Sequence, residues 1–185
     1  MQTYEMDIEG LKRELPLCRV SDDVYIGAFV MFGDVELTVH CAQELLKRAP
    51  EYDYILAPEA KSIPLIYEMT RQSGENRYFL VQKTPKLYMS GMFEVEVKSI
   101  TTEAKQKLIL DKADADEISG KRILIVDDVI STGASLKAVE TLVEKAGGIV
   151  VGKMFVLAEG AAHKRDDIIY LARLPFFNPD GTPIS

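Results

Sequence analysis

Short apolar runs alternate with helical patterns along the middle of the chain, and this alternation restricts the fold more than any other feature. Uninterrupted apolar strands are typical of a parallel sheet that helices cover on both faces. The sequence therefore predicts an α/β fold with a mostly parallel central sheet flanked by helices. Ligands of such sheets bind beyond the carboxyl ends of the strands, so the loops there are candidate sites. The apolar runs cover 54–57, 78–81, 122–126 and 149–157, with a short last strand at 168–171, and the helical patterns cover 35–48, 63–72 and 136–145.

A different pattern occupies the segment between the second and third apolar runs. Residues 83–92 are polar and contain a proline and a glycine, which is typical of a loop. Residues 93–97 and 106–110 alternate polar and apolar side chains, which predicts a hairpin. We expect the stretch 83–103 to be a flexible lid over a site at the edge of the sheet.

The two ends of the chain are less regular than its middle. An irregular arm is predicted over 1–24, with one short amphipathic helix over 8–15 that Pro16 stops. We expect this arm to pack with the proline-containing tail as a small cap. At this length the chain favours one domain, 1–185, with a hood contributed by about 1–30 and 160–185.

Composition and charge argue against several classes of function. The chain has 185 residues and a net charge of −7, so general electrostatic binding to nucleic acid or an anionic membrane is not expected. No window approaches the roughly 18 apolar residues of a membrane span. Cys18 and Cys41 lie far apart, and His40 and His163 are isolated, which favours free thiols over a disulfide or a zinc site. We expect a cytoplasmic protein.

One segment combines a buried strand, two adjacent acids and a small, hydroxyl-rich turn. Residues 123–136 read ILIVDDVISTGASL, in which the strand carries Asp127 and Asp128 to the edge of the sheet. Carboxylates suit the hydroxyls of a sugar, and backbone N–H groups at the start of a helix suit a phosphate. The segment predicts a pocket for a phosphorylated ribose; a capped turn with solvated acids is the alternative. The chain has neither a P-loop nor a Rossmann glycine pattern.

Three segments resemble motifs of the type I phosphoribosyltransferases. VDDVISTGAS closely resembles the motif that binds 5-phosphoribosyl 1-pyrophosphate (PRPP) in this family. PEAKS at 58–62 resembles the Glu-Ala-Arg-Gly pyrophosphate loop of adenine phosphoribosyltransferases, and QKTPKL at 82–87 resembles their Arg-Lys-Pro-Gly-Lys-Leu stretch. The resemblance covers about residues 50 to 160 and points to the purine branch.

The resemblance implies the type I fold, a homodimer, and a reaction in which a nucleobase displaces pyrophosphate from PRPP. Adenine would give AMP, as in purine salvage, with Mg²⁺ carried by PRPP and at most water-bridged to the two aspartates. The implied catalytic residues are Asp128, Glu96 and Lys83. The implied PRPP-binding residues are Asp127, Asp128, Ser131, Thr132, Gly133, Ala134 and Ser135, and the implied pyrophosphate-binding residues are Glu59, Ala60, Lys61, Ser62, Lys83 and Lys86.

The chain departs from the family pattern in ways that bear on these roles. Lys61 replaces an arginine and Ser62 a glycine in the pyrophosphate loop; lysine keeps the charge but loses bidentate hydrogen bonding. The resemblance makes Glu96 the candidate counterpart of a lid glutamate, but Val97 stands where a tyrosine is expected. The alternative is that Glu94 and Glu96 form the wet face of a hairpin.

The nucleobase is the part of the substrate that these motifs do not read. Ser131 argues against the hypoxanthine-guanine branch, in which an aspartate occupies that place. Aromatic residues could hold a purine or simply belong to the core: Phe29, Phe32, Phe176 and Phe177. Two alternatives stay open, a phosphoribosyltransferase for xanthine or another base, and a non-catalytic PRPP-binding regulator, which would need a DNA-binding module that the short acidic arm does not offer.

Overall fold

The structure is a computed structural model of the chain, and it describes residues 2–98 and 105–184. Its centre is a five-stranded sheet with the order β10-β9-β8-β4-β5, in which every neighbouring pair is parallel. This confirms the predicted parallel sheet. The strands are β4 Tyr54–Pro58, β5 Tyr78–Val81, β8 Arg122–Ile130, β9 Ile149–Glu159 and β10 Ile169–Leu174.

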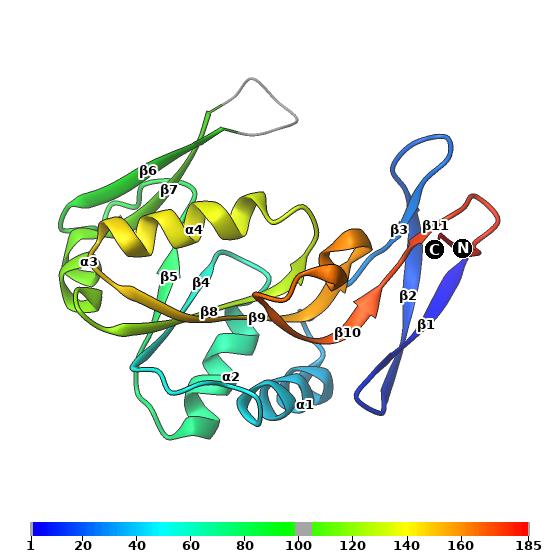
Figure 1. Ribbon diagram of the computed structural model, residues 1–185, viewed down its shortest axis with the longest axis horizontal. Helices are drawn as coiled ribbons and strands as arrows, with labels where there is room; N and C mark the ends of the chain where they lie inside the picture. The colour runs from blue at the N-terminus through cyan, green and yellow to red at the C-terminus, as the bar shows by residue number, and fades with distance from the viewer. Residues whose placement is uncertain (1, 99–104, 185) are drawn as a thin grey trace.

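Helices cover both faces of this sheet (Figure 1). On one face lie α1 (Val35–Leu46) and α2 (Ile63–Ser73), and on the other lie α3 (Lys112–Ile118) and α4 (Ala134–Lys145). Each face has its own cluster of buried apolar side chains. The first cluster also takes in side chains from both ends of the chain, so the same core supports the sheet and the hood.

Helix α1 illustrates how local sequence sets an element. The Asp34 carboxylate accepts a hydrogen bond from the Leu37 amide at 3.0 Å, which satisfies one of the free N–H groups of the first turn. Leu37, Cys41 and Leu45 recur at helical spacing and are buried. The predicted helix is therefore confirmed, although it ends two residues earlier than the pattern suggested.

An antiparallel hairpin stands beside α4, formed by β6 (Met92–Lys98) and β7 (Lys105–Asp111). Its base is tied to the central sheet, because the Gln82 and Ile109 backbones exchange hydrogen bonds of 2.8 and 2.7 Å. The hairpin is as predicted. Part of the expected lid, 99–103, lies outside the described residues.

The two ends of the chain form a second sheet at the far end of the molecule, which we call the hood, and its strands pair antiparallel (Figure 1). Its strand order is β1-β2-β3-β11-β12. The 3-10 helix η1 (Gly160–Lys164) follows β9 between the central sheet and the hood. The hood strands are β1 Thr3–Ile8, β2 Leu11–Arg19, β3 Tyr25–Gly27, β11 Phe176–Phe177 and β12 Pro183–Ile184.

The predicted helix over 8–15 is wrong, because these residues form the turn and second strand of a β-hairpin. Glu9 and Gly10 have φ values of 52° and 89°, which close a tight turn between β1 and β2. Buried side chains on β2 alternate, with Leu15 and Leu17 facing the core. The apolar residues at helical spacing also fit this period of two, and tertiary pairing selected the strand.

Helix α3 was not predicted. Its seven residues bury only Ala115 and Ile118, so it has little apolar periodicity, and its start depends on the Asp111 carboxylate, which accepts from the Ala113 amide at 3.2 Å. Within the described ranges, none of the helices has the length and apolar character that crossing a membrane requires.

Candidate functional site

The loops at the carboxyl ends of β4, β5 and β8 carry the residues that sequence motifs had singled out. Strand β8 runs through Asp127 and Asp128 to Ile130, four residues beyond the predicted end, because its backbone stays paired with β9. Both acids therefore lie on a rigid strand. Ser131, Thr132 and Gly133 form the turn, and α4 begins at Ala134, two residues earlier than predicted.

The turn is open and has its polar groups at the start of a helix. Ser131, Thr132 and Ser135 are exposed, and the Ala134 amide donates a long hydrogen bond, 3.4 Å, to Thr132 Oγ1. Gly133 has a φ of 81°, a conformation that favours glycine. The exposed N–H groups and the positive end of the α4 dipole suit a phosphate.

Asp127 and Asp128 are adjacent on a strand, so their side chains point to opposite faces of the sheet. Asp128 is buried, and Asp127 is partly buried and accepts a hydrogen bond from the Asp128 amide at 2.9 Å. Burial, followed by the neighbouring Asp128 charge, raises the pKa of Asp127 to about 7. A carboxyl group with this pKa gains or loses a proton near neutral pH. A bound cation or a pair of sugar hydroxyls would change that pKa.

The loop after β4 contacts the acidic pair directly. Lys61 Nζ lies 3.0 Å from Asp128 Oδ2, although within the described ranges this oxygen accepts no hydrogen bond of good geometry. Ser62 is fully buried and donates to the Pro58 carbonyl at 2.8 Å, which fixes the shape of the loop. The peptide bond between Glu59 and Ala60 is cis. Ser62 thus holds the loop from within, and its part in binding pyrophosphate stays a prediction.

Glu59 joins the same loop to the segment after β5. Its Oε1 accepts from the Lys83 amide at 2.7 Å, and its Oε2 lies 3.8 Å from Lys86 Nζ. Lys86 also donates to Thr84 Oγ1 at 3.0 Å. The structure therefore brings Lys61, Lys83 and Lys86 to two neighbouring loops. Lys61 and Lys83 are exposed. Lys61 contacts the acidic pair, and Lys83 and Lys86 lie at Glu59, in a protein whose net charge is −7.

The predicted lid glutamate lies on the hairpin beside α4. Val95 is buried in the cluster beneath α4, so Glu94 and Glu96 share the opposite, exposed face of β6. Glu94 pairs with Lys107 at 2.9 Å, and Lys107 is also the residue opposite Glu96 in the strand register. This arrangement fits a solvent-exposed face of the hairpin as well as a catalytic glutamate, so the role of Glu96 stays a prediction.

The aromatic candidates for a base site separate into two groups. Phe29 and Phe177 are buried core residues. Phe32 is exposed beside α1, and Phe176 is partly exposed with its ring against Gly160, directly after β9. Of the four, Phe176 is the one that lies at the carboxyl edge of the sheet.

Sequence reasoning missed one residue at this edge. Arg165 follows η1, and its guanidinium lies so close to Gly133 that a Cβ added to this glycine would overlap Nη1. The only signal in the sequence is its position in the loop after the fourth apolar run, where ligand-binding residues are expected. Among the described residues, no group of three or more His, Cys, Asp or Glu side chains could hold a metal ion.

Comparisons with known proteins agree with this geometry. The chain is 29% identical to an adenine phosphoribosyltransferase of Thermosipho africanus (strain TCF52B), over 87% of this chain and 92% of that protein. It is 33% identical to one of Rhodococcus jostii (strain RHA1), over 74% of each. The crystal structure of adenine phosphoribosyltransferase from Thermoanaerobacter pseudethanolicus shares its fold, with a TM-score of 0.67 at 24% identity, covering 92% of this chain and 95% of that chain.

A family match covers the central sheet and all of the loops described above. Residues 39–174 match the phosphoribosyl transferase domain family, and they include every strand from β4 to β10 together with the acidic pair and the turn before α4. The chain belongs to the phosphoribosyltransferase family.

Proposed function

We propose that the protein is an adenine phosphoribosyltransferase, which converts adenine and PRPP to AMP and pyrophosphate. The observation that carries the proposal is the junction of three loops, in which Lys61 contacts Asp128 and Glu59 contacts the Lys83 amide. These contacts support a site for ribose and phosphate beside a cationic site for pyrophosphate. The names of the relatives support adenine as the base.

The chemistry follows from the charges at the site. Nitrogen N9 of adenine forms a bond to C1 of the ribose while the bond from C1 to the pyrophosphate oxygen breaks. The electron pair leaves with pyrophosphate, and the N9 proton passes to a base, for which Glu96 is the candidate. Positive charge develops on the ribose and negative charge on the leaving group, so neutralising pyrophosphate lowers the barrier.

In this proposal each loop has a separate task. Asp127 and Asp128 bind the ribose hydroxyls, and the turn after β8 binds the 5-phosphate with its backbone N–H groups and hydroxyls. Glu59 and the buried Ser62 hold the loop around Ala60 and Lys61 in shape for pyrophosphate. The residues proposed to bind the 5-phosphate are Ser131, Thr132, Gly133, Ala134 and Ser135. Those proposed to neutralise pyrophosphate are Lys61, Lys83 and Lys86.

The described residues fit a Mg²⁺ ion that arrives with PRPP better than a metal bound by protein alone. Asp128 Oδ2 is a buried acceptor without a hydrogen bond of good geometry within the described ranges, and the protein gathers fewer than three acidic ligands there. Asp127 and Asp128 would hold the ion through water. When bound, Mg²⁺ supplies positive charge to the leaving pyrophosphate.

The test is turnover of a panel of bases with PRPP and Mg²⁺: adenine, hypoxanthine, guanine, xanthine and orotate. We expect adenine to be converted with the highest kcat/KM. Turnover of xanthine alone would keep the phosphoribosyltransferase and replace its base. No turnover, together with no PRPP-dependent rise in Tm, would overturn the proposal.

We further propose a cytoplasmic homodimer formed from a single domain, with its hood built by both chain ends. The two cysteines are free, which suits a reducing compartment. The outer surfaces of α1 and α2 support a self-association site, since Val35 and Tyr67 are 74% and 56% exposed and flank a pocket of about 220 Å³. Light scattering of Tyr67→Glu should detect monomers if this surface forms the dimer.

A further inference from the structure

Arg165 lies where the segment after β9 passes the turn before α4. Its Nε and Nη2 donate to the two carboxylate oxygens of Asp167, at 2.9 and 2.8 Å. The remaining nitrogen, Nη1, faces Gly133, and within the described ranges it donates no hydrogen bond. One edge of the guanidinium is therefore fixed, and the other is directed at the turn.

The partner of Arg165 is itself anchored to α4. Lys153 Nζ lies 2.6 Å from Asp167 Oδ2 and 2.9 Å from Glu140 Oε1, and Glu140 belongs to α4. Lys153 and Glu140 are largely buried, with side-chain exposures of 16% and 14%. This chain of ion pairs sets the position of Arg165 relative to the helix whose first turn it faces.

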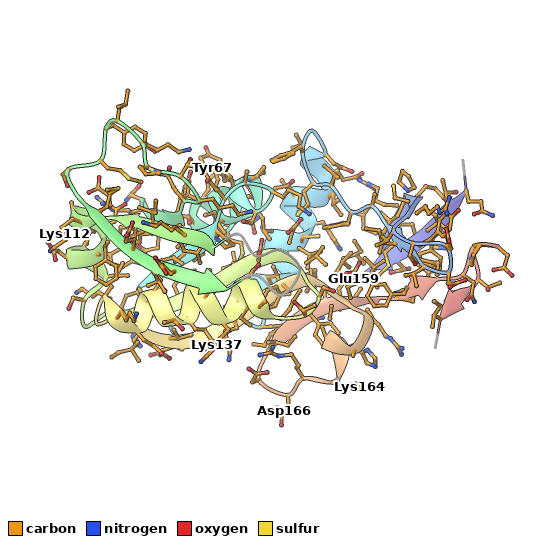
Figure 2. The ribbon with its side chains drawn as sticks, turned by 90° about the horizontal axis from the view of Figure 1, so that it is seen from above. Tyr67, Lys112, Lys137, Glu159, Lys164 and Asp166 are labelled. Atoms are coloured by element: carbon orange, nitrogen blue, oxygen red, sulfur yellow. The ribbon has the colours of Figure 1, made fainter. Side chains whose placement is uncertain are left out.

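The turn itself offers no full positive charge to a bound phosphate, and a cation beside it would supply one. The turn residues 131–135 contain hydroxyls and backbone N–H groups but no charged side chain. A phosphate with two negative charges would otherwise meet only partial charges at this end of the site. In Figure 2 the neighbouring Asp166 lies at the outer edge of the molecule.

We propose that Arg165 binds the 5-phosphate of the ribose, as a specificity residue for phosphorylated sugars, and that Asp167 is its positioning residue. The inference rests on the proposed function and adds a side-chain cation to the turn. Two features favour glycine at position 133. Its φ is positive, and a side chain there would displace Nη1 of Arg165. The ligand class is a ribose with a terminal phosphate dianion.

The experiment compares two product-like ligands that occupy opposite ends of the site. Ribose 5-phosphate carries the group that Arg165 would bind, and pyrophosphate with Mg²⁺ carries the group that the lysines would bind. Inhibition constants are measured for both against the wild-type protein, Arg165→Gln, Arg165→Lys and Asp167→Asn. We expect Arg165→Gln to raise the inhibition constant of ribose 5-phosphate by about 10- to 100-fold, the range of a charge-assisted hydrogen bond. The inhibition constant of pyrophosphate should change by less than about 3-fold.

The conservative variants separate binding from positioning. Arg165→Lys should recover only part of the loss, because lysine cannot bond Asp167 and phosphate in one plane. Asp167→Asn should raise KM for PRPP by a smaller factor than Arg165→Gln, with kcat nearly unchanged. The matched control is Arg122→Gln, since Arg122 also bonds both oxygens of an aspartate, Asp53, but at the start of β8, away from the turn.

Each outcome decides between the claims. An equal loss for both ligands, or a loss of the same size in Arg122→Gln, would overturn the role of Arg165, because the effect would then be general. Unchanged ribose 5-phosphate inhibition in Arg165→Gln would overturn it as well. If the wild-type protein bound neither ligand nor PRPP, the proposed function itself would fail, and that result is distinct from the other two.

Discussion

Lys61 Nζ lies 3.0 Å from Asp128 Oδ2, and this ion pair joins the loop after β4 to the end of β8. The two partners differ in their surroundings, since the Lys61 side chain is 50% exposed and the Asp128 side chain is 5% exposed. A half-exposed cation therefore covers a buried carboxylate. Exchange of this cation for the substrate's own groups would release Lys61 toward the pyrophosphate.

Replacing Lys61 by methionine tests this relationship. The buried carboxylate would lose its cation, so we expect the free energy of unfolding to fall by about 1–3 kcal/mol. We also expect kcat/KM for PRPP to fall by about 10- to 100-fold. Chemical denaturation and steady-state kinetics measure the two effects. Lys12→Met is the control, because Lys12 and Glu5 form an exposed pair at 2.7 Å, whose loss should cost less stability than the loss of the Lys61 pair.

The other half of the pair should behave differently. Asp128→Asn removes a buried charge, so we expect little loss of stability, but the rise in Tm with PRPP and Mg²⁺ should disappear. A variant that kept the full PRPP-dependent rise would show that Asp128 does not bind the sugar or its metal.

The raised pKa of Asp127 makes stability depend on pH. Between about pH 4 and 7 the folded protein keeps a proton that the unfolded chain has lost, so unfolding becomes easier as pH rises through this window. A rise from 3.8 to about 7 corresponds to at most about 4 kcal/mol. We expect Asp127→Asn to match the wild-type protein near pH 4, to exceed its stability at pH 8, and to lose activity.

Asp53→Asn is the control of opposite sign. The Arg122 guanidinium and amide hold the pKa of Asp53 below its ordinary value, so this carboxyl stabilises the fold increasingly as pH rises above that lowered pKa. Its removal should therefore cost more at pH 8 than at low pH. Denaturation curves at several pH values measure both slopes, and equal slopes in the two variants would contradict the role of burial at Asp127.

The sequence allowed the central sheet and its loops to be predicted for a physical reason. Apolar runs that are buried on both faces leave a strong signal, as in β4, β8 and β9, and the cap of α1 is a local interaction between Asp34 and Leu37. The N-terminal hairpin could not be distinguished in this way from an amphipathic helix. Its pairing depends on a hood to which β3 and β11 also contribute, and no local pattern reports such contacts.

The site divides along the same line. Residues within one motif, such as Asp127 and Asp128, were found because the chemistry and the spacing are local. The Lys61 contact with Asp128 and the Glu59 contact with Lys83 join separate motifs, so their distances needed the fold. Arg165 lies 32 residues beyond Gly133 in sequence, and only the tertiary arrangement brings its charge to the turn.

Gly160 connects the central sheet to the hood in a way that a substitution can test. It has a φ of 55°, and an added Cβ would overlap the ring of Phe176 in β11. We expect Gly160→Ala to lower the free energy of unfolding by about 2–4 kcal/mol through strain and overpacking. Because Phe176 lies at the carboxyl edge of the sheet, KM for the base should rise as well.

Two further variants identify the cause of that loss. Gly120→Ala has a similar φ of 73° but meets no atom within 4 Å, so it should cost only about 1 kcal/mol. Adding Phe176→Leu to Gly160→Ala should restore part of the stability by making space. If Gly120→Ala were as unstable as Gly160→Ala, the contact with Phe176 would not be the reason.

The two cysteines provide a probe of the core that needs no assumption about the base. Cys18 is exposed on β2, whereas Cys41 is buried in α1, and burial raises the pKa of its thiol to about 12. We expect a thiol reagent at pH 8 to label Cys18 rapidly and Cys41 only at the rate of local or global unfolding. Mass spectrometry of Cys18→Ser and Cys41→Ser assigns the two phases. PRPP with Mg²⁺ should slow the Cys41 phase by stabilising the folded state, and rapid labelling of Cys41 would contradict its place in the core.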